Sequence, residues 1–262
     1  AGWHDALGAL YAAQERWPEA RQAYEQAAAL DPTNDAYHHH LGVAHHQLAQ
    51  HAPAVQQLQR AAEIQPQRAA YHADLAQALM AQGEYAQALE AYRRALALDD
   101  GTAAYHYGAG RALYHLHAHA DALAELEQAA ILAPARAEIH NQIGLTHEAL
   151  ERPRKALQKY LLAGALAPEQ ARYRRNAGRV YNQLGDTERA LETLQHAIAL
   201  QPDDGEAHHQ LGRAYQAQQA YQQALDAYHK AIQLAPDVGQ HHLQAGIVCR
   251  QLGHHEEALA LL

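Results

Sequence analysis

Histidine is the residue type in this sequence with the most chemistry to offer. Residues 34–50 read NDAYHHHLGVAHHQLAQ and carry five of the chain's 22 histidines. Imidazole rings bind zinc or nickel when several of them converge on one point, and they titrate at about pH 6.5. The stretch is therefore a metal site, a pH-sensitive segment or a set of rings that only fill space.

The spacing of these histidines argues against a metal site. His38 and His45 lie seven residues apart, which on a helix separates them by roughly 10 Å along the axis. Two ligands on one helix need a spacing of about three or four residues. His115 and His119 meet that requirement, but the turn between two expected helices falls within the pair. We therefore expect no metal and no cofactor.

The number of histidines indicates a response to pH more strongly than it indicates a metal site. Full protonation of all 22 rings would take the net charge from −9 to +13. Because histidine titrates at about pH 6.5, solubility or association should respond between about pH 7 and pH 5.

An internal period decides where these side chains lie. The sequence aligns to itself in lines of 34 residues without an insertion or a deletion, and we number the positions of a line as its places. Alanine recurs at places 20 and 27 and proline at place 32. Place 8 holds Gly8, Gly42, Ala76, Gly110, Gly144, Gly178, Gly212 and Gly246. A period of this length is typical of a protein built from stacked repeats.

Each line predicts two amphipathic helices. Leu75 and Leu79, followed by Ala88 and Tyr92, recur at helical spacing. The small residues at places 8, 20 and 27 lie where two helices must approach closely. Proline at place 32 ends the second helix, and a glycine such as Gly83 between the helices suits a left-handed cap.

Place 24 alternates strictly between tyrosine and leucine. Its residues are Tyr24, Leu58, Tyr92, Leu126, Tyr160, Leu194, Tyr228 and Leu262. Either a pair of lines was the unit of duplication, or large and small side chains interleave along the core. Both readings are structural.

The whole chain resembles an array of tetratricopeptide repeats. The first line meets the family pattern with Leu7, Gly8, Tyr11, Ala20, Tyr24, Ala27 and Pro32. The resemblance implies an all-α fold, a right-handed superhelical solenoid of antiparallel helix pairs whose first helices line a concave groove. We expect one domain at 1–262, with repeats at 1–34, 35–68, 69–102, 103–136, 137–170, 171–204 and 205–238 and a partial repeat at 239–262.

Many of the histidines follow from this pattern. They occupy places 4 and 11, where the family has an aromatic ring: His4, His38, His72, His106, His140, His208 and His242 at place 4, and His45 and His147 at place 11. We expect these flat rings to fill structural positions.

The concave groove that the resemblance implies carries a local positive strip. Its candidate peptide-binding residues are Arg172, Arg175, Asn176 and Arg179 in the sixth repeat, with Arg213, Asn141 and Gln142 from the neighbouring repeats. Guanidinium groups and amides suit an acidic or carboxylate-ending peptide. Alternatively, the arginines pair within the chain with Glu138, Glu148 and Glu206. Tyr107 and Arg111 form a separate aromatic and basic patch.

Both ends of the sequence lack the polar cap that a repeat solenoid usually needs. We expect the apolar end surfaces to include Trp3, Leu7, Tyr11, Ala258, Leu259, Leu261 and Leu262. Identical chains could stack head to tail through these surfaces, which would give a filament or a tube unless the geometry closes a ring. The alternatives are that the sequence is a segment of a longer array or of a multidomain protein, or that the chain is an ordinary monomer.

Composition excludes several classes of function. Twenty basic against 29 acidic side chains make nucleic acid an unsuitable partner. Charges interrupt every apolar stretch, so we expect no membrane span. The chain has one cysteine, no serine and no glycine-rich phosphate loop, so we expect no catalytic activity. The single cysteine leaves the cellular compartment open.

The sequence therefore predicts a non-enzymatic scaffold for protein–protein interaction. Its preferred specific form is head-to-tail self-assembly. One alternative is an adaptor for acidic or extended peptides, and another is the regulatory repeat segment of a larger enzyme such as a protein glycosyltransferase.

Overall fold

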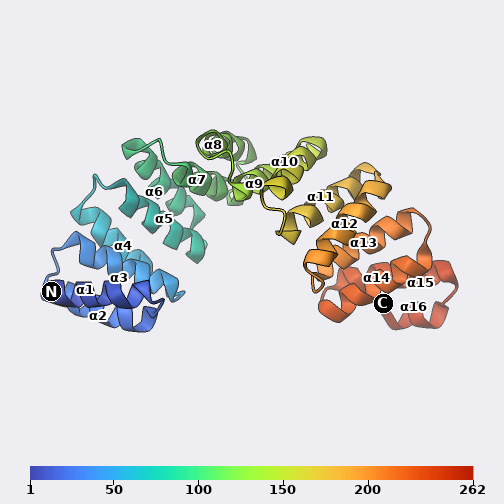
Figure 1. Cartoon of the computed structure of the whole chain (residues 1–262), viewed down its shortest axis with the longest axis horizontal. Coiled ribbons are helices and arrows are strands. Elements are labelled where there is room, and N and C mark those ends of the chain that lie inside the picture. The colour runs from blue at the N-terminus through green and yellow to red at the C-terminus, as the bar shows by residue number, and fades with distance from the viewer. Residues whose placement is uncertain (262) are drawn as a thin grey trace. The chain divides into compact units, whose positions relative to one another are not determined.

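The computed structural model describes residues 1–261, and these residues form sixteen α-helices with no strand among them. The helices come in antiparallel pairs, one pair for each predicted repeat (Figure 1). The prediction of an all-helical repeat array is confirmed. No helix in the described part of the chain is long and apolar enough to span a membrane.

Contacts within the chain divide it into two compact units, Ala1–Pro134 and Ala135–Leu262. The first unit contains α1 (Gly2–Ala13), α2 (Trp17–Leu30), α3 (Asp35–Gln47), α4 (His51–Ile64), α5 (Ala69–Gln82), α6 (Tyr85–Leu98), α7 (Ala103–His115) and α8 (His119–Leu132). The second contains α9 (Ala137–Ala149), α10 (Pro153–Leu166), α11 (Ala171–Leu184), α12 (Thr187–Leu200), α13 (Gly205–Ala217), α14 (Tyr221–Leu234), α15 (Gly239–Leu252) and α16 (His255–Leu261). A single solenoid over the whole chain, and its right hand, stay predictions.

Within each unit, the first helices of successive repeats contact one another. α3 contacts α5 and α5 contacts α7 in the first unit, and α11 contacts α13 in the second. Within a unit, each first helix after the opening one also packs on the second helix of the repeat before it. Side chains that project from one first helix toward the next therefore gather on a shared face, which we call the inner face of the unit.

The glycine at place 8 lets the two helices of a repeat approach closely. A Cβ added at Gly144 would lie 2.5 Å from the ring of Tyr160, and one added at Gly178 would lie 2.5 Å from Leu194. Both of these place-24 side chains are fully buried. The alternating tyrosine and leucine thus fill the space that the glycine leaves open, as the spacing of small residues predicts.

In the third repeat the place-24 side chain is accommodated differently, because place 8 is not glycine. It carries Ala76 at place 8, and the end of the Tyr92 ring lies over Gly108 of the following repeat, where an added Cβ would be 2.2 Å from the ring. Ala76 and Tyr92 belong to one buried cluster with Ala109 and Leu113. A methyl group at place 8 is thus accompanied by a glycine at place 6 of the next repeat.

Several place-4 histidines tie a first helix to the turn before it. In His72, His208 and His242, Nε2 donates to the carbonyl oxygen of the proline six residues earlier, at 2.9, 3.0 and 2.8 Å. His38 and His106 make the equivalent bonds at 3.0 Å. Because a carbonyl oxygen can only accept, the proton lies on Nε2. These rings therefore hold the repeat junctions together in addition to filling the aromatic position.

The turns between the two helices of a repeat use a left-handed residue at place 15. Gly83, Gly185 and Gly253 have φ angles of 85°, 77° and 81° there, which confirms the predicted caps. In the other five described turns the residue is Glu15, Ala49, His117, Glu151 or Gln219, with φ between 55° and 61°. Packing of the helix pair thus imposes this conformation even on residues that disfavour it.

Replacing Ala49 with glycine should stabilise the protein, and replacing Gly83 with alanine should destabilise it. A left-handed conformation costs an alanine about 1 kcal/mol more than a glycine. We expect the free energy of unfolding to rise by somewhat less than this in Ala49→Gly, because glycine also gains entropy in the unfolded chain. Urea unfolding followed by far-ultraviolet circular dichroism measures both variants. A loss of stability in Ala49→Gly would contradict this account of the turn.

Candidate protein-binding surfaces

The arginines of the sixth repeat lie on the inner face of the second unit, but two of them are paired within the chain. Arg179 donates from both terminal nitrogens to the carboxylate of Glu148 at 2.6 Å, and the Tyr160 hydroxyl donates to the same carboxylate. Arg175 donates to Asp204, a buried carboxylate, at 2.8 Å. Both arginines are therefore already matched with an acidic group.

Burial and pairing shift the pKa of Arg179 in opposite directions. Burial lowers the pKa of its guanidinium, but the hydrogen bonds to Glu148 and the negative charge of that carboxylate raise the pKa by more, so it lies above its ordinary value. Because Arg179 stays charged and bound, an incoming carboxylate would have to displace Glu148. The predicted alternative of intramolecular pairing thus describes this side chain.

Two of the three amides predicted for the groove bond to each other. Asn176 donates to the side-chain oxygen of Asn141 at 2.9 Å, and Gln142 is half-buried beside it. Arg172 donates to the Tyr173 hydroxyl at 2.9 Å and lies 4.8 Å from the centre of that ring.

Arg213 contacts the inner-face amides only weakly. Its Nη1 lies 3.4 Å from the side-chain oxygen of Gln210. Gln210 in turn donates to Glu206 at 2.7 Å, and its backbone carbonyl accepts from Asn182 at 2.8 Å. Glu206, which the sequence offers as an arginine partner, is therefore engaged by an amide.

The first unit holds the other predicted patch, around Arg111. Its guanidinium lies 5.7 Å from the centre of the Tyr107 ring, as a cation over an aromatic face. No carboxylate in residues 1–261 forms an ion pair with this exposed arginine.

The charge of Arg111 affects the pKa of two neighbouring side chains. Burial lowers the pKa of the nearby His115, and the positive charge of Arg111 lowers it further. Burial raises the pKa of Tyr92 to about 12, although Arg111 opposes that rise.

The first helix of the chain exposes an apolar face. Trp3 and Leu10 are 70% and 57% exposed, while Leu7 and Tyr11 are half-buried. At place 10 every other repeat has a fully buried alanine, threonine or valine. Leu10 is not among the residues that the sequence singles out, although comparing this place between repeats would have found it.

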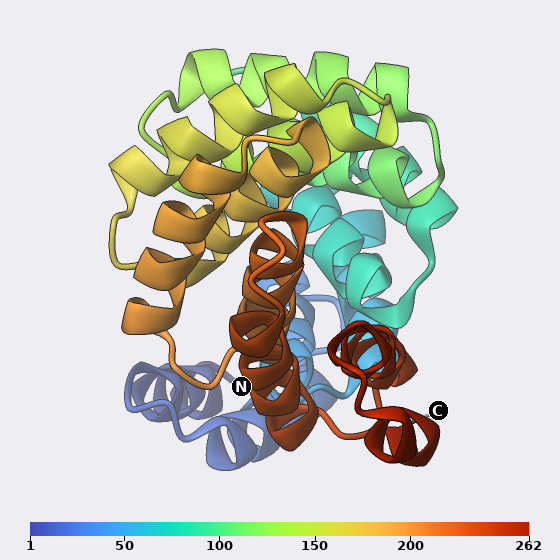
Figure 2. The same cartoon turned by 90° about the vertical axis from the view of Figure 1, so that its right-hand side faces the viewer.

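The other end of the chain carries an apolar groove of about 400 Å³ between α15 and α16. Its lining residues are Leu243, Gly246, Ile247, Arg250, His255, Ala258 and Leu259. Leu259 is 77% exposed, Leu243 is 44% exposed and Ala258 is buried. The predicted residue Leu261 is half-buried on α16, and Leu262 lies outside the described residues. This end of the second unit is drawn in dark red in Figure 2.

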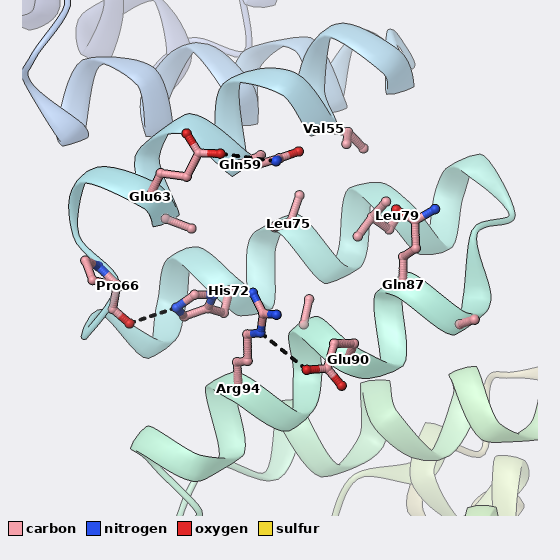
Figure 3. Close-up of a pocket in the computed structure, with 13 residues that line it drawn as sticks. Val55, Gln59, Glu63, Pro66, His72, Leu75, Leu79, Gln87, Glu90 and Arg94 are labelled. Carbon is pink, nitrogen blue, oxygen red and sulfur yellow. Dashed lines mark hydrogen bonds and ion pairs between the residues drawn. The ribbon is translucent and has the colours of Figure 1, made fainter.

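Two further clefts lie between neighbouring second helices. One, of about 610 Å³, runs between α4 and α6 with α5 as its floor (Figure 3). Val55, Leu75 and Leu79 make its apolar base, and an ion pair of 3.4 Å between Glu90 and Arg94 lies at its rim. A cleft of about 480 Å³ lies between α10 and α12 over α11 in the second unit. The stacking of repeats produces both clefts.

A metal site is not apparent in the described residues. Within residues 1–261, no three side chains of histidine, cysteine, aspartate or glutamate gather where they could hold a metal ion. The one cysteine, Cys249, is fully buried in α15.

Comparison with protein families finds repeat models along most of the chain. Tetratricopeptide repeat models match residues 36–68, 73–137 and 205–238, and a TPR repeat model matches residues 8–48 and 178–219. A model of the Est1 DNA/RNA binding domain matches residues 224–259. The absence of a nucleic-acid partner stays a prediction. No curated protein matches the chain.

Solved structures of repeat proteins share the fold. YrrB, described as a TPR protein with an unusual peptide-binding site, has 24% sequence identity and a TM-score of 0.60, covering 70% of this chain and 95% of its own. PilF of Pseudomonas aeruginosa has 22% identity and a TM-score of 0.68, covering 86% and 96%. The Cut9–Hcn1 assembly has 18% identity and a TM-score of 0.71, and this chain covers 45% of the matched chain. The period, the helix pairs and the family matches agree, and the chain belongs to the tetratricopeptide repeat family of protein–protein interaction scaffolds.

Proposed function

We propose that the chain binds other protein chains rather than catalysing a reaction, and that its specific activity is head-to-tail self-association. The observation that carries this proposal is the exposure of Trp3 and Leu10, at places that the other repeats bury in whole or in part. Place 3 is buried in Tyr71, Ile139 and Tyr173. A first helix with large apolar side chains at places 3 and 10 is therefore suited to pack on another repeat.

The contacts between repeats define the register that such packing would follow. Residues at place 5 meet places 3 and 6 of the next repeat: His39 stacks on Tyr71 with ring centres 4.5 Å apart and bonds to Asp74 at 2.6 Å. Place 21 meets place 10 of the next repeat, since Leu225 and Val248 share one buried cluster. The same relations hold across several junctions inside both units.

Continuing this register into a second copy brings apolar side chains together. Trp3 and Ala6 of the incoming copy would lie on Leu243, and Leu10 would lie on Leu259. Fully burying a side chain of this size contributes about 1.5 to 3 kcal/mol. Association itself costs at least about 4 kcal/mol, so we expect a concentration-dependent equilibrium rather than an irreversible aggregate.

Replacing Trp3 with serine should abolish self-association without unfolding the chain, because Trp3 is 70% exposed in the single chain. Analytical ultracentrifugation over a wide range of concentration measures the effect. Leu259→Asp should act in the same way from the opposite end, since a buried carboxylate without a partner is costly. Circular dichroism confirms that both variants stay folded.

Ile131→Asp is the matched control for this test. Ile131 is 69% exposed, like Trp3, but it lies on α8 and not on α1, α15 or α16, the helices that carry the two end surfaces. The control should associate as the parent chain does. A parent chain that sediments as a 28.8 kDa monomer at every concentration would rule out the proposal.

The patch around Arg111 favours a second candidate function, binding an acidic or carboxylate-ending peptide. The Arg111 guanidinium faces Tyr107 and has no ion pair with a carboxylate in the described chain. The arginines of the sixth repeat instead have acidic partners in Glu148 and Asp204. A guanidinium without an acidic partner can receive a carboxylate without displacing an existing one.

Arg111→Gln should weaken the binding of a fluorescent acidic peptide by roughly tenfold or more, the effect of losing one charge-assisted hydrogen bond. Fluorescence anisotropy measures the affinity. Arg175→Gln is the comparison, because Arg175 already binds Asp204 at 2.8 Å, and it should change the affinity less. Equal losses in the two variants would contradict a site centred on Arg111.

A further inference from the structure

Two histidines of successive repeats face each other at the junction of α13 and α15. His209 and His241 are each 3% exposed. Their Nδ1 atoms lie 3.0 Å apart, and the ring centres are 4.8 Å apart. One ring therefore donates an Nδ1 proton to the lone pair of the other, and the junction depends on one Nδ1 remaining without a proton.

The groups around this pair do little to stabilise a second positive charge on it. The charged or titratable groups that face it are Glu206 and Arg213 on α13, His242 on α15 and Tyr228 on α14. Glu206 favours protonation, but it already accepts a hydrogen bond from Gln210 at 2.7 Å. Arg213 and His242 oppose protonation. The Tyr228 ring lies 5.4 Å from His209, and its hydroxyl donates to Gln216 at 2.9 Å.

Other junctions use histidine differently. In the first unit His39 bonds to Asp74 at 2.6 Å and His40 bonds to Asp5 at 2.7 Å, both across successive repeats. Protonation turns those contacts into ion pairs. Only a contact between two rings is broken when both rings are protonated, because two N–H groups then face each other.

We propose that the His209 and His241 pair is an acid-sensitive latch, which releases α15 and α16 from α13 and α14 when the second ring nitrogen is protonated. The released surface is the buried cluster of Ala224, Leu225, Tyr228, Ala245, Val248, Cys249 and Ala258. Acid would therefore undock the last repeat while the repeats before it remain paired. The inference concerns this junction alone and does not depend on self-association.

The direction of the titration agrees with this geometry. Burial lowers the pKa of His209 to about 4, and the neighbouring His241 and Arg213 add to that effect while Glu206 opposes it. Burial also lowers the pKa of His241. Because the undocked rings bind protons more tightly than the docked rings, the junction weakens as the pH falls. The loss begins near the ordinary histidine pKa of 6.5 and extends to about 4.

Cys249 provides a reporter of this release. It is the only cysteine in the chain, it lies in α15, and it is fully buried in the cluster that the latch holds closed. Its rate of labelling by a dithiodipyridine reagent is compared with the rate in urea-unfolded protein at the same pH, which cancels the lower reactivity of thiols in acid. The ratio of unfolded to folded rates is the protection of Cys249.

We expect this protection to fall by at least roughly tenfold between about pH 7.5 and about pH 4.5, the range that spans the titration of histidine. Hydrogen exchange measured by mass spectrometry should show α15 opening while α9 to α12 stay protected. Unchanged protection over this range would overturn the proposal, and so would a uniform loss along all of the second unit.

His241→Tyr tests whether the pair is the sensor. The variant copies the stacking of His39 on Tyr71, in which a histidine at place 5 meets a tyrosine at place 3 of the next repeat. It also removes one of the two ring nitrogens that face each other. The acid-induced loss of Cys249 protection should then become clearly smaller, because His209 no longer faces a second ring nitrogen. If this variant does not fold, His209→Asn, which copies Asn141 at place 5 of the fifth repeat, replaces it.

His208→Gln is the control, since His208 is the neighbour of His209 on α13 but bonds to the Pro202 carbonyl outside the pair. It should keep the pH response of the parent chain. An acid response that persists unchanged in both His241→Tyr and His209→Asn would assign the release to other groups and overturn the proposal.

Discussion

The rest of this structure depends on the close approach of two helices over a residue with no side chain. At Gly144 the ring of Tyr160 occupies the space where a Cβ would lie, 2.5 Å away. Dispersion and burial of the ring then hold the pair together, because protein interiors are packed too densely to leave such a space empty. The alanines at places 20 and 27 act with the glycine, and they are buried in every described repeat. Helix spacing in turn sets which places reach the next repeat.

Much of this could be predicted from the sequence, because the period repeats the same physical requirements. Small residues at a fixed place predict close helices, and glycine before a second helix predicts the left-handed turn of Gly83 and Gly185. Pairing between repeats was harder to predict. The sequence pattern indicates Glu148 as a partner for the arginines of the sixth repeat. It does not indicate Asp204, which binds Arg175 at 2.8 Å, because Asp204 lies in a turn that the helical pattern does not describe. The facing of His209 and His241 requires knowing that place 5 meets place 3.

The inner faces show how a scaffold of this kind limits its own binding sites. Each polar side chain that bonds to a neighbouring repeat stabilises the stack, but it is then less available to a ligand. Arg179 illustrates this trade, because its two bonds to Glu148 strengthen the contact between successive repeats. The surfaces that we propose for partners are the apolar ends, where Trp3, Leu10 and Leu259 are exposed, and the patch at Arg111, whose guanidinium has no ion pair with a carboxylate in the described residues.

The most direct test of the central claim is a double-mutant cycle in the fifth repeat. It introduces there the combination found at the third repeat, alanine at place 8 with glycine at place 6 of the following repeat. Gly144→Ala introduces the methyl group of Ala76, and Asn176→Gly provides the space that Gly108 gives to Tyr92. We expect Gly144→Ala alone to lower the free energy of unfolding by about 1 to 3 kcal/mol, the usual cost of overpacking. Asn176→Gly alone should also destabilise, through glycine in a helix and the lost bond to Asn141. The double variant should be more stable than the sum of the two losses predicts, by about 1 kcal/mol. Strict additivity, or no cost for Gly144→Ala, would contradict the claim that contact between places 8 and 24 sets the helix spacing.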